Sequence, residues 1–71
     1  MEKKDELIYD IIFGEEVFFN INLSEYVSDI YHYEDFVDDI KFVMKKSKIT
    51  IARSVIKVDS KTAIWELKVK K

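Results

Sequence analysis

The sequence predicts an α+β domain in which a four-stranded, mostly antiparallel sheet carries one long helix on one face. Three observations support this class: a helical apolar pattern over residues 24–48, two strand-like segments after it, and strand-like segments before it. The expected order is strand, strand, helix, strand, strand (ββαββ), in a single domain spanning residues 1–71. A short N-terminal helix in place of the first strand is the alternative.

The first segment, residues 7–13, fits two structures. As a strand, its alternation places Tyr9 and Ile11 on one face, and its β-branched and aromatic content favours this interpretation. As a helix, it would be capped by Asp5 and would end at Gly14 in a left-handed conformation. We take the strand as the first interpretation and keep the helix as the alternative. Either way, the sequence assigns Gly14 a positive φ, at a hairpin turn or after a helix.

The segment 17–23 predicts a second strand by strict alternation. Its apolar side chains are Val17, Phe19, Ile21 and Leu23, and its other face carries Phe18, Asn20 and Asn22.

Residues 24–48 predict one long helix beginning at an N-cap, Ser24. Apolar side chains recur at spacings of four and three along it: Tyr26, Ile30, Tyr33, Val37, Ile40 and Met44. The opposite surface is acidic at first and basic at the end, which is the order that the helix dipole favours.

Residues 49–58 and 62–70 predict a hairpin across residues 59–61. The second strand alternates cleanly, with Trp65 on its apolar face. The first changes phase near Arg53 and Ser54, which indicates either a β-bulge or a strand covered on both faces. The face of the sheet opposite the helix would then carry four large apolar residues: Ile8, Ile12, Phe18 and Ile64. Such a face predicts a partner or a homodimer, unless the strand phases differ and these residues belong to the core.

The two halves of the chain carry opposite charge. Residues 1–39 hold twelve acids against Lys3 and Lys4, a net charge of −10, and residues 40–71 hold ten bases against Asp59 and Glu66, a net charge of +8. The simpler interpretation is that the two halves neutralise each other within one compact fold. The other is that each half faces a partner of opposite charge.

No motif indicates catalysis or a cofactor. The single histidine, His32, shares a helix face with Glu25, Asp29, Asp35 and Asp39, a residue set that suits a divalent ion. One histidine on an open helix surface lacks the convergent ligands of a dedicated site, so we predict no metal, no cofactor and no enzymatic activity. The chain has no cysteine and no apolar segment of membrane-spanning length, which predicts a cytoplasmic protein without membrane contact.

We therefore predict a protein-binding module, a regulator or inhibitor, whose partner has a basic groove. Small rigid folds with rows of carboxylates can imitate a nucleic-acid backbone, and such inhibitors are often encoded by viruses and mobile elements. The binding residues would be Asp29, Glu34, Asp35, Asp38 and Asp39 on the helix and Phe18 on the sheet. The alternative is a nucleic-acid-binding protein that uses Arg53, Lys57, Lys61, Lys68 and Lys70. Trp65 could stack on a base, but its apolar face predicts a core position, and the pI of about 5.3 argues against this class.

Overall fold

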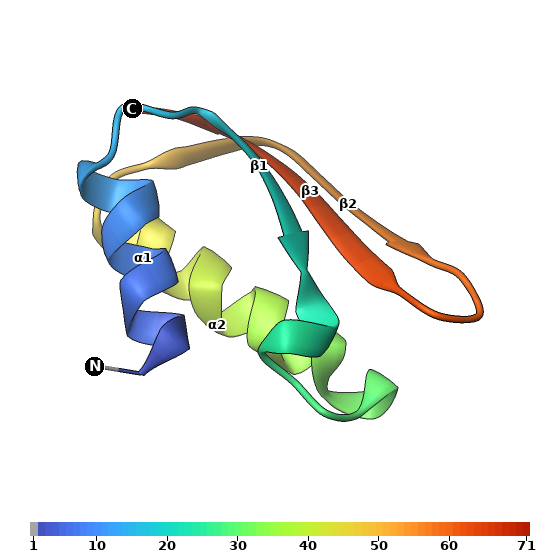
Figure 1. Cartoon of the computed structure of the whole chain (residues 1–71). Coiled ribbons are helices and arrows are strands. Elements are labelled where there is room, and N and C mark those ends of the chain that lie inside the picture. Colours follow the sequence, from blue (N-terminus) through green and yellow to red (C-terminus); the bar gives the residue numbers. More distant parts are fainter. Residues whose placement is uncertain (1) are drawn as a thin grey trace.

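The computed structural model describes residues 2–71 and contains two helices over one face of a three-stranded sheet (Figure 1). In chain order the elements are α1 (Lys3–Phe13), β1 (Phe18–Asn22), the 3-10 turns η1 (Leu23–Glu25) and η2 (Ile30–His32), α2 (Tyr33–Lys46), β2 (Thr50–Val58) and β3 (Ala63–Lys70). The sheet is antiparallel throughout, with the strand order β1-β3-β2. The α+β class is confirmed, whereas the predicted fourth strand is not present among the described residues.

Residues 7–13 belong to the helix α1 and not to a strand, so the alternative prediction is the correct one. Leu7 and Ile11, one turn apart, are buried, and Ile8 and Ile12 pack against the same core. This single continuous apolar stripe can be buried as a helix, whereas a strand would divide it between two faces. The burial of the stripe outweighs the β-propensity of the segment.

Gly14 does not have the positive φ that the sequence predicted: its φ is −74°. Its backbone N–H donates to the Asp10 carbonyl oxygen at 2.9 Å. A Cβ at this position would overlap that same carbonyl oxygen. The glycine is therefore required for a close approach of two backbone segments rather than for a left-handed conformation.

The predicted long helix is shorter than expected, because two side chains begin turns of their own before it. Asn22, not Ser24, caps the first turn: its Oδ1 accepts from the Ser24 N–H at 3.1 Å. Asp29 Oδ1 accepts from the Tyr31 N–H at 2.8 Å and begins the second turn. Such local hydrogen bonds compete with a continuous helix, so α2 begins only at Tyr33.

The C-terminus of α2 closes in a Schellman motif. The Ile49 N–H donates to the Met44 carbonyl at 2.9 Å and the Lys48 N–H to the Lys45 carbonyl at 3.1 Å. Lys48 has a φ of 60°, the left-handed conformation for which glycine is usually preferred. Ile49 is buried beyond it and turns the chain into β2.

The predicted C-terminal hairpin is confirmed, including its bulge. The register of β2 and β3 shifts between Ile51 and Arg53, so Ala52 is the extra residue and the phase of the strand changes there. At the turn, Asp59 Oδ1 accepts from the backbone N–H groups of Lys61 (2.8 Å) and Thr62 (2.7 Å). These hydrogen bonds lower the pKa of the Asp59 carboxyl.

The core lies between the helices and the central strand. Trp65 is fully buried, and its Nε1 donates to Ser54 Oγ on β2 at 2.8 Å. The other buried apolar residues are Leu7 and Ile11 of α1, Ile21 and Leu23, Phe36, Val37, Ile40 and Met44 of α2, Ile49, and Ala63, Leu67 and Val69 of β3. The sheet face with Trp65 is therefore covered, and its other face carries no helix (Figure 1).

Candidate interaction surfaces

The five acidic residues predicted to bind a partner lie on the helical side of the molecule. Glu34 and Asp35 occupy the first turn of α2, and Asp38 and Asp39 follow one turn later, all exposed. Asp39 Oδ2 lies 3.1 Å from Lys4 Nζ and so links α2 to α1. No ion pair within residues 2–71 engages Glu34, Asp35 or Asp38. We call these three residues the acidic helix surface.

Asp29 has a structural role at the start of η2. It caps Tyr31, and its Oδ2 lies 3.7 Å from His32 Nδ1. Within the described residues, no group of three or more histidine and acidic side chains is placed to hold a metal ion.

An apolar groove, which the sequence did not predict, opens beside the acidic helix surface. It has a volume of about 450 Å³ and lies between the start of α2 and the hairpin end of β2. Its lining residues are Ile30, Tyr31, Tyr33, Glu34, Ile56 and Val58. Three of these are large apolar side chains open to solvent: Ile30 is 55%, Tyr31 86% and Val58 53% exposed. The exposure of Ile30 follows from the break in the predicted helix, which removes this residue from the buried stripe where the sequence placed it.

On the opposite side lies the outer sheet face, which carries most of the cations of the β2–β3 hairpin. Its residues are Phe18, Asn20 and Asn22 of β1, Ile64, Glu66, Lys68 and Lys70 of β3, and Thr50, Arg53, Val55 and Lys57 of β2. Lys61 lies apart from them in the turn. One row across the strands consists of Phe18, Lys68 and Arg53, with Lys68 Nζ 5.0 Å from the centroid of the Phe18 ring.

Among residues 2–71, Glu66 is the only acid on the outer sheet face. Its Oε1 lies 2.7 Å from Lys57 Nζ and 3.7 Å from Arg53 Nη2. The hydrogen bond from Lys57, together with the positive charges of Lys57 and Arg53, lowers the pKa of this carboxyl. Glu66 therefore stays ionised near neutral pH and holds both cations over the centre of the sheet.

One prediction about this face needs correction. Ile8 and Ile12, expected on the outer sheet face, belong to α1 and pack against the core, because residues 7–13 are helical. Phe18 does lie on the face, 65% exposed, where it neighbours cations, and the sheet separates it from the acidic residues of α2.

The two charged halves do not neutralise each other by direct pairing. Within residues 2–71, the ion pairs join Lys4 to Asp39, His32 to Asp29, and Glu66 to both Arg53 and Lys57. Each pair lies inside its own half of the chain, at 1–39 or 40–71. The acidic first turns of α2 and the cations of the outer sheet face therefore lie on opposite sides of the sheet.

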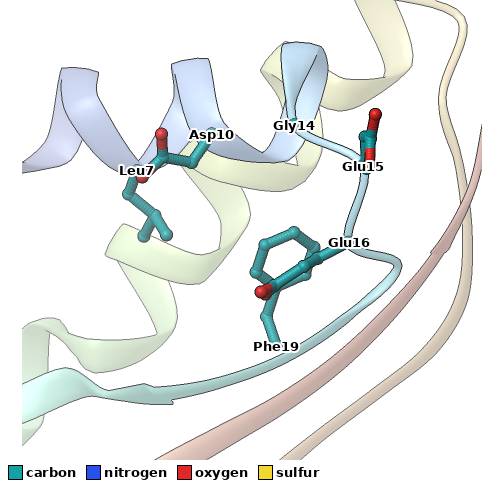
Figure 2. Close-up of a pocket in the computed structure, with 6 residues that line it drawn as sticks. All are labelled: Leu7, Asp10, Gly14, Glu15, Glu16 and Phe19. Atoms are coloured by element: carbon teal, nitrogen blue, oxygen red, sulfur yellow. The ribbon is translucent and has the colours of Figure 1, made fainter.

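A second hollow, of about 520 Å³, lies between α1 and β1. Figure 2 shows its carboxylates, those of Asp10, Glu15 and Glu16, lying apart from one another, with the Glu16 side chain crossing the ring of Phe19 in this view. Acid–base chemistry requires carboxyl groups that converge on a shared point. This hollow does not provide that arrangement.

Comparisons with protein families, characterised proteins and solved structures give no match. Neither helix of residues 2–71 combines the length and apolar composition that crossing a bilayer requires. The acidic helix surface, with the apolar groove beside it, and the outer sheet face are therefore the two candidate interaction surfaces.

Proposed function

We propose that this chain is a non-catalytic, intracellular interaction module that binds a protein with a basic surface and acts as its regulator or inhibitor. The observation that carries the proposal is the position of the apolar groove directly beside the acidic helix surface. Glu34 belongs to both, so the contact residues and the charged residues form one continuous area.

The two parts of this area would contribute differently to binding. Ile30 and Val58 are about half exposed, and completing their burial would contribute roughly 1 kcal/mol each. Tyr31, at 86% exposure, is the strongest candidate for an anchor, since buried tyrosines dominate many interfaces. The unpaired carboxylates would mainly raise the association rate and exclude acidic partners.

The test is affinity capture from the cells that encode the protein, with matched variants immobilised beside the natural chain. The groove variant is Tyr31→Ser with Val58→Thr, and the charge variant is Glu34→Gln with Asp38→Asn. The control is Tyr9→Ser with Phe13→Ser, because these rings are similarly exposed, at 58% and 68%, but lie on α1.

We expect a partner that the natural chain and the control retain and that the groove variant loses. The charge variant should retain less of it, with the greatest difference at low salt. A partner retained equally by all four proteins would contradict the proposal. A homodimer is the alternative use of the groove, and sedimentation velocity over a concentration series tests it: a strict monomer at micromolar concentration excludes it.

A further inference from the structure

We propose that the outer sheet face binds single-stranded nucleic acid, with the Phe18 ring stacking against a base and Lys68 and Arg53 contacting phosphates. The proposal is independent of the protein-binding function, because it uses the opposite side of the sheet. Either can fail without the other.

Phe18, Lys68 and Arg53 form a row across the outer sheet face. They are register partners on three adjacent strands, and adjacent strands lie about 4.8 Å apart. An aromatic ring, an ammonium group and a guanidinium group therefore follow one another across about 10 Å of flat surface. Bases stack on aromatic rings while cations follow the backbone, and this row provides both.

The charge of the outer sheet face is complementary to that of a polyanion. The face holds four cations against one carboxylate, Glu66, which Lys57 and Arg53 already engage. Lys68 and Lys70 have no carboxylate partner within residues 2–71. The excess positive charge favours a polyanion, and the acids of α2 lie on the far side of the sheet.

The position of Phe18 favours a single strand over a duplex. Phe18 is 65% exposed on the edge strand β1, where an unpaired base can reach its ring. Bases inside a duplex are already stacked on one another and cannot. The amides of Asn20 and Asn22 lie on the same strand and face, and they offer donors and acceptors to base edges.

The chain contains its own matched control for this site. Phe42 on α2 is 60% exposed, with Lys46 Nζ 4.7 Å from its ring centroid, so it repeats the phenylalanine–lysine pair of Phe18 and Lys68 on a helix, away from the outer sheet face. Phe42→Ala therefore removes a ring of the same kind and exposure from a place where the proposal predicts no nucleic acid.

The test is fluorescence anisotropy of labelled dT15, rU15 and a 15-base-pair DNA duplex, titrated with the full chain between 25 and 200 mM NaCl. We expect a single strand to bind more tightly than the duplex, and the tighter of dT15 and rU15 identifies DNA or RNA. Phe18→Ala should weaken this binding about 5- to 100-fold, the usual effect of losing one stacked base, while Phe42→Ala leaves it unchanged. Lys68→Gln should reduce the slope of log K against log salt by about 0.7, as expected for one lost phosphate contact.

Circular dichroism of each variant confirms that it is folded. Absence of binding at 25 mM NaCl would overturn the proposal. So would equal affinities of the natural chain and Phe18→Ala, since charge alone would then explain the binding. Binding of labelled poly-glutamate as tight as that of the single strand would assign the face to an acidic protein instead.

Discussion

The hydrogen bond between Trp65 and Ser54 gives the sharpest test of the fold. The indole is fully buried, and its Nε1 donates to Ser54 Oγ at 2.8 Å across two paired strands. Ser54→Ala removes the acceptor and leaves the indole N–H without a partner in the core. An unsatisfied buried donor costs about 1–3 kcal/mol.

That cost is large for a chain of 71 residues, whose free energy of unfolding is expected to be about 4–10 kcal/mol. In a domain of this size, each kcal/mol lowers Tm by about 4–8 °C, so Ser54→Ala should lower it by roughly 5–20 °C. Urea unfolding followed by circular dichroism and by the fluorescence of the single tryptophan measures the change. Ser60→Ala, at an exposed position in the hairpin turn, is the control and should have little effect.

A double-mutant cycle separates the hydrogen bond from general packing. In a Trp65→Phe background the donor is absent, so Ser54→Ala should there cost less than half of what it costs in the natural chain. The same loss in both backgrounds would refute the assigned role of Ser54.

Three further predictions concern the turns and the outer sheet face. Lys48→Gly should stabilise the protein by about 0.5–1 kcal/mol in urea unfolding, because it removes a side chain from a left-handed residue, whereas Lys48→Ala should not. Gly14→Ala should lower the unfolding free energy by about 1–3 kcal/mol, because the new Cβ meets the Asp10 carbonyl, and a neutral result would show that the helix end adjusts freely. Glu66→Gln should lower the urea midpoint at pH 7. The folded-state pKa of Glu66 is lowered by Lys57 and Arg53, so the stabilisation is present above the unfolded-state pKa and is lost as the pH falls through the folded-state pKa. The urea midpoints of the natural chain and the variant should therefore converge as the pH falls below the folded-state pKa.

The C-terminal half of the fold could be predicted from the sequence because its signals agree. The alternation around Trp65 reflects one covered face, and all four inward residues of β3 are buried. Even the bulge was detectable, because an extra residue at Ala52 must reverse the alternation of the strand.

The N-terminal half was harder because local and periodic signals disagree there. Residues 7–13 have strand-like composition and helical spacing, and burial decided between them. In the segment 24–48, the apolar spacing continues through Asp29, although that residue caps a separate 3-10 turn, η2. The sequence did contain a signal for this turn, because an aspartate such as Asp29 often accepts a hydrogen bond from the backbone N–H two residues later. The regular apolar spacing around Asp29 made the continuous helix the more obvious prediction.

The sequence predicted which charged residues are exposed, but not which exposed residues lie side by side. The acidic residues of α2 and the cations of the hairpin lie outside, as their charge requires. Whether Phe18 joined one set or the other depended on strand pairing, which a single sequence does not determine. The groove of Ile30, Tyr31 and Val58 joins segments far apart in the chain and could not be found by periodicity.

The bulge at Ala52 also affects how the protein behaves when it is crowded. β2 is the longer of the two edge strands, nine residues against five in β1, and its outer edge is where a neighbouring molecule could add a strand. A bulge makes the hydrogen-bonding groups along that edge irregular, so an incoming strand that starts in register beside Ile51 loses it by Arg53. The irregularity that complicated the interpretation of the strand thus gives the chain protection against edge-to-edge aggregation.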